Sequence, residues 1–477
     1  MTLADNVRNL TTEHQQVASM RILIFALSIF LSAFATLTAI ADEPLRVASF
    51  RADATPPLGS PLCNGNVTPV MEIVSPLTAR GVVLLGAGDP IVLCAVDWVG
   101  IGNGSYDEFR KLIADAVVTT PDRVALHTLH QHDAPGSDFA TEKLLAEHGL
   151  GRQFSNPDFD AEVMERVSAA AKLALKNAQA VTHIGLGSGR VEKVASNRRI
   201  LGPDGKVVLQ RQSSGGRNPA AREAPEGTID PLVRMVSFWN EDKPLAVLTY
   251  YATHPQSFYG RGGVNWDFVG VARAMREEAL SALPHVHFDG AGGNVAAGKY
   301  NDGSQEKRPL LAQRLAEGMK LAWESQKKSP IRASDVDWSI VRVSLPVRDT
   351  LVEDKLLAKV RNEDEPTKGR LRAARDLTFV RRMNDGHRIP LTCLKLGTAR
   401  VLHMPGELFV EYQLAANNMR PDDFIAMAAY GDYGPGYIGT EIAYGQGGYE
   451  TGRVSRVAPK VERVLMDAMK QLLHVTP

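Results

Sequence analysis

Cysteine is scarce in this 477-residue sequence: there are three, Cys63, Cys94 and Cys393, and no two are spaced as a metal-binding pair. This scarcity excludes a small disulfide-stabilised scaffold and a cysteine-ligated zinc module. Cys94 lies in the apolar stretch IVLCAVDW, which is typical of a buried strand in which cysteine acts as a small apolar residue. The sequence alone leaves a Cys63–Cys393 disulfide open.

Excess charge is also absent. The sequence has 54 lysines and arginines against 54 aspartates and glutamates, and it contains no basic tract. We therefore expect no binding to nucleic acid, because such binding needs a positively charged surface. The hydrophobic fraction of 44% and the charged fraction of 23% are ordinary for a globular protein. At this length they suffice for a large core.

A long hydrophobic run occurs once, near the N-terminus. Arg21 is followed by an apolar run from Ile22 to Ile40, and Ala39-Ile40-Ala41 precedes an acidic, proline-containing segment. A positive charge, an apolar segment and small residues in this order are typical of a secretory signal peptide. No later stretch is long and apolar enough to span a bilayer.

We interpret residues 20–41 as a signal peptide that begins at Met20, preceded by a non-native N-terminal extension of residues 1–19. An uncleaved N-terminal membrane anchor is the alternative, because the apolar run approaches the length of a membrane span. Both interpretations place residues 42–477 outside the cytoplasm, in a secreted or periplasmic protein.

Segments typical of strands and helices alternate along residues 42–477 without an evident internal repeat. The stretch 79–100 contains two apolar segments joined by Gly-Ala-Gly-Asp-Pro, which predicts a β-hairpin. A helix is predicted over 105–118, with Ser105 as its N-cap. The glycines of GLGSG, residues 185–189, are interpreted as an irregularity in a strand. The whole pattern predicts an α/β fold of mixed sheets with flanking helices in one domain.

Three histidines lie close together in HTLHQHDAPG, residues 127–136. Alternate side chains of a strand share a face, so His130 and His132 are predicted to point to one side and His127 to the other. Two imidazoles before a Pro-Gly turn suit a metal ligand beside a general acid or base. They suit a hydrogen-bonded polar strand end equally well, and the motif alone does not decide.

Two other segments carry side chains of related chemistry. His254 ends the apolar strand predicted in TYYATHPQS, and Pro255 favours an extended backbone at the histidine. Glu407 follows a Pro-Gly turn in HMPGELFVEYQ, where we expect it in the first turn of a helix. There a carboxylate serves either as a ligand or as a group that stabilises the helix dipole. Asp267 begins another predicted helix, as a cap or as a group that orients a ligand.

Two glycine-rich segments complete the candidate site. Residues 431–450 combine glycines with several tyrosines, among them Tyr433 and Tyr437, which suits either a ligand-contacting loop or an ordinary surface loop. FDGAGGNVAAG, residues 288–298, follows a predicted strand, and its backbone amides can form a nest for an anion. Neither segment has the spacing of a nucleotide-binding loop.

Taken in this order, these segments resemble the catalytic domain of the neutral ceramidase family, from ASFRADATPPLG to GGYE. HQHDAPG stands where that family has His-Thr-His-Ser-Gly-Pro-Gly. The match implies a zinc ligand at His130 and a second catalytic imidazole at His132. The matching Thr-His-Pro and Pro-Gly-Glu segments imply two more zinc ligands, His254 and Glu407.

The resemblance extends to groups around this zinc. The family's Asn-Arg pair matches Asn197-Arg198, which implies that Arg198 contacts the substrate. The family's Gly-Tyr-Val-Thr-Thr stretch aligns best through Tyr437. This implies a fourth zinc ligand at Tyr437 and a catalytic, substrate-contacting hydroxyl at Tyr433. The intervening Gly-Pro-Gly shifts the local register, so an exchange of these two roles is also open.

The sequence departs from the family in two places. The family's Gly-Asp-Val-Ser-Pro-Asn contains a serine with a catalytic role, and it corresponds to a loop with Gly293, Asn294 and Ala296. Ala296 can neither act as a nucleophile nor donate a hydrogen bond. Residues 42–477 correspond to the catalytic domain, and we expect no C-terminal immunoglobulin-like domain.

The resemblance implies a secreted zinc-dependent hydrolase that cleaves an amide bond of an N-acyl (sphingo)lipid or similar substrate, with peripheral membrane contact. Two imidazoles and one carboxylate leave a zinc position for water, so a serine nucleophile is not required. One alternative is a zinc-dependent esterase or other hydrolase that acts on a non-sphingolipid substrate. Another is a catalytically degenerate, zinc-containing module that binds lipid or glycan.

Overall fold

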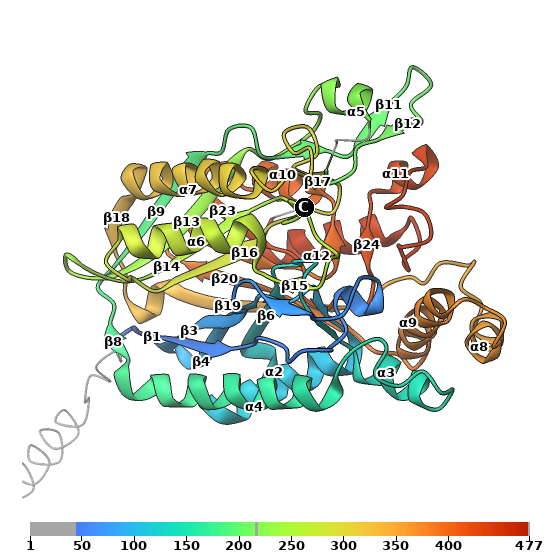
Figure 1. The fold of residues 1–477 in the computed structure, drawn as a ribbon. Helices are drawn as coiled ribbons and strands as arrows, with labels where there is room; N and C mark the ends of the chain where they lie inside the picture. The colour runs from blue at the N-terminus through green and yellow to red at the C-terminus, as the bar shows by residue number, and fades with distance from the viewer. Residues whose placement is uncertain (1–43, 215–217, 476–477) are drawn as a thin grey trace, which may run out of the picture. The chain divides into compact units, whose positions relative to one another are not determined.

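Three mixed β-sheets with helices on their outer faces form the part of the chain that the structure describes, residues 44–214 and 218–475 of a computed structural model (Figure 1). The predicted α/β fold of mixed sheets with flanking helices is thereby confirmed. The predicted signal peptide and the preceding extension lie outside the described residues. Within the described residues, no helix has the length and apolar character needed to cross a membrane.

The first sheet has the strand order β6-β4-β3-β1-β8. Its strands are β1 (Arg46–Asp53), β3 (Thr78–Gly86), β4 (Gly88–Val96), β6 (Val124–Thr128) and β8 (Gln179–Ala180). The predicted hairpin is present, because β3 and β4 pair antiparallel. Strand β6 pairs parallel to β4, and α2 (Asn103–Val117) lies between them in the chain. Helix α4 (Pro157–Ala174) packs beside α2 and against β1.

The second sheet has the order β16-β14-β13-β9-β18. Its strands are β9 (His183–Arg190), β13 (Leu232–Asn240), β14 (Lys243–Tyr251), β16 (His285–Asp289) and β18 (Lys327–Pro330). Strands β13 and β14 form an antiparallel hairpin, and β16 pairs parallel to β14. Helix α6 (Asp267–Ala279) lies between β14 and β16 in the chain, and α7 (Lys307–Ser325) packs against α6 and β9.

The third sheet has the order β19-β20-β21-β23. Its strands are β19 (Val336–Val343), β20 (Ile389–Leu396), β21 (Ala399–His403) and β23 (Phe424–Ala428). Strands β20 and β21 form an antiparallel hairpin, and β23 pairs parallel to β21. Helix α10 (Val410–Met419) lies between β21 and β23 in the chain, and α12 (Val461–Leu472) packs against β19 and β20.

Each sheet therefore contains the same arrangement: a hairpin, a helix, and a strand parallel to the hairpin's second strand. We call these the first unit (β3, β4, α2, β6), the second unit (β13, β14, α6, β16) and the third unit (β20, β21, α10, β23). Each parallel pair extends over five residue pairs. The sequence shows no matching repeat, so the repetition is one of topology. In each unit the carboxyl ends of two parallel strands meet at one edge, where α/β folds commonly place ligands.

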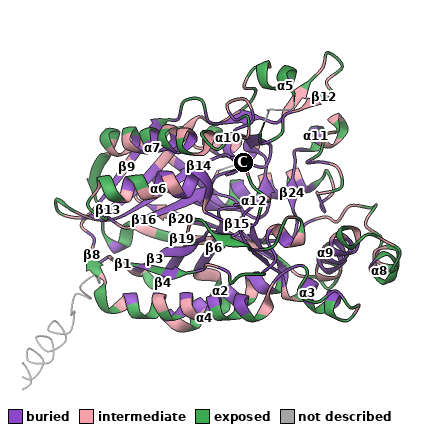
Figure 2. Ribbon diagram, in the orientation of Figure 1, coloured by how far each residue is buried: buried purple, intermediate pink, exposed green. Residues whose placement is uncertain are grey.

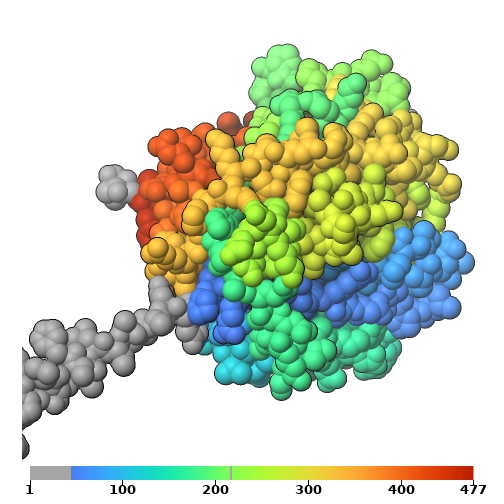
Figure 3. All heavy atoms as spheres, turned by 90° about the vertical axis from the view of Figure 1, so that its left-hand side faces the viewer, coloured from blue at the N-terminus to red at the C-terminus, as the bar shows by residue number. Residues whose placement is uncertain are grey.

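One hydrophobic core joins the inner faces of all three sheets, through residues such as Leu93, Phe288 and Val401. A second core lies between the first sheet and helices α2 and α4, and a third lies between the third sheet and α12. Figure 2 shows the strands as almost continuously buried and the outer helices as buried on one side only. In the side view of Figure 3, α4 and the first sheet (teal and blue) lie below the helices of the second sheet (yellow).

Smaller elements surround these sheets. The other helices are α3 (Phe139–Ala146), α5 (Pro219–Glu223), α8 (Glu353–Arg361), α9 (Thr367–Asn384) and α11 (Glu441–Gln446), with 3-10 turns η1 (Cys63–Gly65), η2 (Pro121–Arg123), η3 (Leu175–Asn177) and η5 (Ala333–Asp335). The short strand pairs are β2 (Glu72–Ile73) with β15 (Gly263–Val264), β5 (Gly100–Ile101) with β7 (Gly136–Ser137), β10 (Ser196–Asn197) with β17 (Val295–Ala296), β11 (Arg199–Leu201) with β12 (Val207–Gln210), and β22 (Glu407–Leu408) with β24 (Tyr437–Ile438).

Two local predictions are wrong. GLGSG forms part of the continuous strand β9. Its glycines are needed because α7 packs directly on it: a Cβ at Gly187 would lie 2.0 Å from the carbonyl oxygen of Ala322. Ser105 does not cap α2, whose N-cap is Gly102. The Ser105 hydroxyl instead accepts a hydrogen bond from the backbone N–H of Phe139 at 2.8 Å.

Candidate metal centre

His130 follows the first unit's parallel strand, but it does not lie on that strand. Strand β6 ends at Thr128, so the prediction that alternation along a strand orients His130 and His132 is wrong. His130 instead has a left-handed backbone with φ of 55°. Its backbone N–H donates to the carbonyl oxygen of Trp98 at 2.9 Å, and its Nδ1 lies 2.6 Å from the carbonyl oxygen of Val99. These contacts fix the ring and leave Nε2 facing the site.

His254 follows the hairpin strand β14 of the second unit. Its backbone N–H donates to the carbonyl oxygen of Val295, which anchors it beside β17. Its Nδ1 lies 2.7 Å from the carbonyl oxygen of Gly292. The side chain is fully buried, and burial lowers the pKa of His254, which favours the neutral imidazole.

Glu407 comes from the third unit, shortly after β21. It lies in the short strand β22, and α10 begins only at Val410, so its predicted place in the first turn of a helix is wrong. The strand runs parallel to β24, where Glu407 pairs with Tyr437. This close approach requires Gly406, which has a φ of 61° and whose Cβ would lie 2.5 Å from the carbonyl oxygen of Gly436.

These three side chains converge on one point. Glu407 Oε2 lies 3.2 Å from His130 Nε2 and 3.1 Å from His254 Nε2. The three candidate ligand atoms all lie within 4.8 Å of one another, and all three residues are buried. This cluster is a group that could hold a metal ion.

The hydrogen bonds of the two imidazoles fit a metal. Each Nδ1 faces a backbone carbonyl, which can only accept, so Nδ1 carries the proton of a neutral ring. Each Nε2 then presents a lone pair toward Glu407, an arrangement that is repulsive unless a cation lies between them. Two imidazole nitrogens and a carboxylate oxygen are a donor set that zinc commonly takes.

Three tyrosines surround the cluster. The Tyr437 hydroxyl lies 3.1 Å from His254 Nε2, on the side of the candidate ligand atoms. The Tyr433 hydroxyl donates to Glu407 Oε1 at 2.9 Å, away from the histidines. Tyr430, which the sequence reasoning missed, stacks on the His130 ring with centroids 4.8 Å apart. Tyr430 lies two residues after Ala428, the last residue of the parallel strand β23, and this position just beyond an apolar strand was the available sequence signal.

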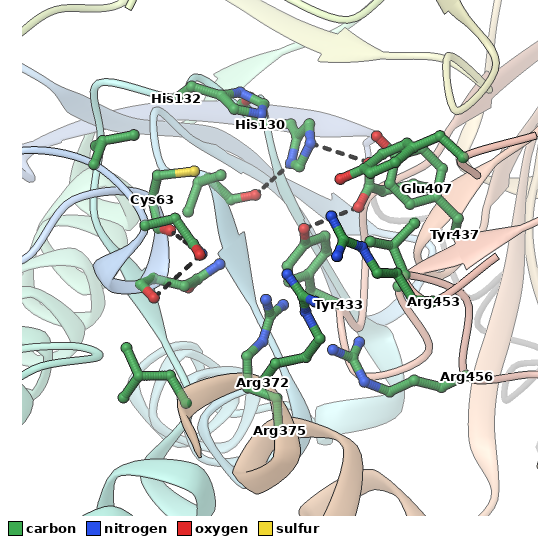
Figure 4. Close-up of a pocket in the computed structure, with 18 of the residues that line it drawn as sticks. Cys63, His130, His132, Arg372, Arg375, Glu407, Tyr433, Tyr437, Arg453 and Arg456 are labelled. Atoms are coloured by element: carbon green, nitrogen blue, oxygen red, sulfur yellow. Dashed lines mark hydrogen bonds and ion pairs between the residues drawn. The ribbon is translucent and has the colours of Figure 1, made fainter. Parts of the chain in front are cut away.

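A pocket of about 260 Å³ opens beside the cluster (Figure 4). It is lined by His130, His132, Glu407, Tyr433 and Tyr437, together with Cys63, Asn64, Asn66, Val67, Val99, Tyr259, Leu371, Arg372, Arg375, Gly436, Tyr449, Arg453, Val454 and Arg456. His130, Glu407 and both tyrosines are therefore reachable by a small molecule, whereas His254 lies fully buried behind them. The sequence reasoning missed the four arginines, whose spacing of three residues within each pair is also that of an ordinary solvated surface.

Comparison with solved structures finds proteins of similar architecture. The neutral ceramidase from Pseudomonas aeruginosa matches with a TM-score of 0.64 and 14% identity, over 91% of this chain and 75% of that chain. A structure described as ceramidase complexed with C2 matches with a TM-score of 0.63 and 15% identity, over 91% and 76%. This chain has the neutral-ceramidase fold. At the level of the sequence, no family model and no curated protein matches it.

The resemblance drawn from a few short sequence segments is thereby confirmed as a likeness of fold.

Arg198 lies near the site of this neutral-ceramidase fold but does not line its pocket. It follows β10 and is 5% exposed. Its Nη1 donates to the Tyr437 hydroxyl at 3.1 Å, and its Nε lies 3.4 Å from Glu450 Oε1. The guanidinium therefore reaches the site through Tyr437.

His132 is half-buried at the pocket wall of this neutral-ceramidase fold. Its Nδ1 lies 2.9 Å from the carbonyl oxygen of His130, so its Nε2 is the atom free to exchange a proton. Burial holds the pKa of His132 well below its usual range. His127 is buried elsewhere, with Nδ1 2.6 Å from the carbonyl oxygen of Ala429.

The predicted substrate loop lies behind the ligands rather than in the pocket lining. A Cβ at Gly293 would lie 2.2 Å from the carbonyl oxygen of Glu407, so this glycine permits close packing against β22. The Asn294 side chain accepts from the Val410 N–H at 2.9 Å and thereby holds the start of α10. Ala296 pairs with Ser196 in β10 and forms a bridge to His254.

Other open interpretations are also decided by the fold. Asp267 lies in the first turn of α6 and accepts hydrogen bonds from the N–H groups of Ser257 and Phe268, so its contacts are those of a local backbone brace. The cysteines are all free, and no Cys63–Cys393 disulfide forms.

Proposed function

We propose that this protein is a zinc-dependent hydrolase that cleaves an amide bond of an N-acyl (sphingo)lipid or similar substrate. The observation that carries the proposal is the convergence of His130, His254 and Glu407 beside an open pocket. The fold shared with neutral ceramidases supports the choice of an amide bond. Zinc bound here would polarise a carbonyl group and lower the pKa of water toward 7.

The chain's own groups have separate tasks in this proposal. His130, His254 and Glu407 hold the metal, and the Tyr437 hydroxyl, 3.1 Å from His254 Nε2, is the fourth donor. Tyr433 fixes Glu407 through its hydrogen bond to Oε1. Arg198 orients the Tyr437 hydroxyl by donating to it. These hydrogen bonds are preformed, so little reorganisation is needed when substrate binds.

His132 is the proposed general acid and base. Its Nδ1 faces the carbonyl oxygen of His130, so the neutral ring has an unprotonated Nε2 that can accept a proton from the attacking water. The protonated ring then delivers the proton to the leaving amine. This removes the need for a serine at position 296, whose alanine lies outside the pocket lining. For that reason we favour a hydrolase over a degenerate binding module.

The test combines metal content with turnover. We expect about one zinc per chain by elemental analysis, and hydrolysis of at least one member of a panel of N-acyl amides. Glu407→Gln and His254→Ala should lose zinc and lower kcat/KM by at least about 100-fold. His148→Ala is the matched control, because this half-buried histidine lies outside the site.

The panel separates the alternatives. Preferential cleavage of acyl esters would identify an esterase. Bound zinc without turnover of amides or esters would identify a binding module and overturn the hydrolase. We further propose export of the mature chain to the periplasm or beyond, based on the apolar run and the Ala39-Ile40-Ala41 site. N-terminal sequencing of the natural protein should then find a start near residue 42.

A further inference from the structure

Four arginines gather on one wall of the pocket. Arg372 and Arg375 lie one turn apart on α9, and Arg453 and Arg456 lie in the segment after α11. Figure 4 shows their guanidinium groups collected on the same side of the pocket, around Tyr433. In this view Arg372, Arg375 and Arg456 lie below Tyr433, the Arg453 guanidinium lies beside the Tyr433–Glu407 hydrogen bond, and His130 lies above.

Most of this charge has no ion-pair partner among the described residues, although the carboxylates of Asp376 and Asp138 lie close enough to act on Arg375. Arg456 forms an ion pair with Asp376 at 2.7 Å and donates to the carbonyl oxygen of Gly434. Among the described residues, no carboxylate forms an ion pair with Arg372, Arg375 or Arg453. The guanidinium of Arg375 instead lies over the Tyr433 ring, 5.2 Å from its centroid.

The pocket supplies no other negative charge to this wall. Glu407 is its one acidic lining residue, and its carboxylate already contacts two histidines and Tyr433. Like charges that converge in a concave site repel one another more strongly than they do on an open surface, because less water screens them. Such an arrangement is stabilised when an anion enters it.

Arginine suits one class of anion in particular. Its planar guanidinium donates two parallel hydrogen bonds to a carboxylate, sulfonate or phosphate. The pocket's size agrees, because 260 Å³ is near the lower end, about 300 Å³, of typical small-molecule sites. A compact polar group fits this space, and a pair of long acyl chains does not.

We propose that the substrate carries an anionic group near the scissile bond, and that Arg372, Arg375 and Arg453 bind this group while His130, His254 and Glu407 hold the metal. This inference rests on the proposed hydrolase function and narrows its substrate to acidic N-acyl compounds. Because guanidinium groups bind both kinds, the anionic group is either a planar carboxylate or a tetrahedral oxyanion.

The test uses matched neutral and anionic probes with zinc-loaded protein. N-hexanoyltaurine and N-hexanoylethanolamine share an acyl chain and differ by a sulfonate on the amine side. In the second pair, N-ethylglutaramate carries a carboxylate at the end of its acyl chain, and N-ethylpentanamide has a methyl group there. Calorimetry measures binding and product analysis measures turnover. We expect the anionic member of at least one pair to bind about tenfold tighter or better, the range of one charge-assisted contact.

Variants assign that preference to the arginines. The double variant Arg372→Gln/Arg453→Gln should lose the preference for the anionic probe while keeping its zinc. Arg375→Gln should weaken that preference. Arg361→Gln, an exposed arginine on the neighbouring α8, should keep it. Equal binding within both pairs, or a preference that survives in the double variant, overturns the proposal.

The two proposals fail separately. Turnover of neutral amides without any preference for anions would leave the hydrolase standing and remove the anion site. Arginine-dependent anion binding without turnover of any probe would support the anion site and count against the hydrolase.

Discussion

Tyr433 and Tyr437 lie four residues apart on one glycine-rich loop, yet their hydroxyl groups contact different atoms. The Tyr437 hydroxyl lies 3.1 Å from His254 Nε2, whereas the Tyr433 hydroxyl donates to Glu407 Oε1, the oxygen turned away from the histidines. The sequence left an exchange of their roles open. The contacts favour Tyr437 as the fourth donor and Tyr433 as the group that orients a ligand.

This assignment predicts a graded loss of zinc affinity. Tyr433→Phe removes one hydrogen bond to Glu407 and should weaken zinc binding about tenfold, as expected for a group that orients a metal ligand. Tyr437→Phe should weaken it more. Competition with a chromophoric chelator measures both. Tyr444→Phe is the control, because that phenol bonds Ser455, away from the candidate ligands. A larger loss for Tyr433→Phe than for Tyr437→Phe would mean that the roles are exchanged.

The thiols give a second prediction at this scale. Burial raises the pKa of Cys63 and of Cys393 to about 12, and it raises the pKa of Cys94 as well. Only the thiolate reacts, so at pH 8 all three native thiols should react with a disulfide reagent at least about 100-fold more slowly than exposed cysteine. After denaturation, three thiols should react at once. A fast-reacting thiol in the native protein would contradict the raised pKa of Cys63, which is half-buried at the pocket wall.

At the scale of elements, local patterns predicted much of the fold. Apolar alternation and a Gly-Asp-Pro turn predicted the β3–β4 hairpin, because both signals act between neighbours in the chain. The pairing of β6 to β4, β16 to β14 and β23 to β21 was not predictable, since each pairing joins strands separated by a helix. The repeated unit therefore became visible only in three dimensions.

The candidate site shows the same division. The resemblance to a family named His130, His254 and Glu407 in advance, and the structure brings these three together. The predicted strand geometry of His130 was wrong, because its orientation comes from tertiary hydrogen bonds to Trp98 and Val99. The four pocket arginines were missed, because charged residues are expected to face solvent unless the element that packs beside them is known.

Strand β9 provides a test of element packing. A Cβ at Gly187 would lie 2.0 Å from the Ala322 carbonyl oxygen in α7, and backbone atoms cannot move aside cheaply. Gly187→Ala should therefore destabilise the protein by about 1–3 kcal/mol through overpacking. Thermal unfolding followed by circular dichroism should show a lower midpoint, with zinc content unchanged.

Gly104→Ala is the matched control for that variant. Gly104 lies in α2 and has no atom within 4 Å of its added Cβ. Alanine there should be neutral or stabilise the helix by up to about 1 kcal/mol. An unchanged midpoint for Gly187→Ala would show that α7 does not pack on β9 as closely as described.

At the scale of the whole molecule, the candidate ligands come one from each unit. His130 follows β6 of the first unit, His254 follows β14 of the second, and Glu407 follows β21 of the third. A metal held by all three, as we propose, would link sheets that otherwise meet through the central hydrophobic core. Because the unfolded chain does not bring these side chains together, the proposed metal binding would be coupled to folding.

This coupling predicts that zinc stabilises the entire described body of the protein. Free zinc at about 1,000 times its Kd adds about 4 kcal/mol to the free energy of unfolding. An excess of chelator should lower the thermal midpoint of the wild-type protein, and added zinc should restore it. Glu407→Gln, which lacks one ligand, should show little response to either. The same chelator loaded with zinc beforehand controls for its other effects. Were the midpoint to stay constant after verified metal removal, the ion would not be joining the three units, and the convergence of His130, His254 and Glu407 would need another physical cause.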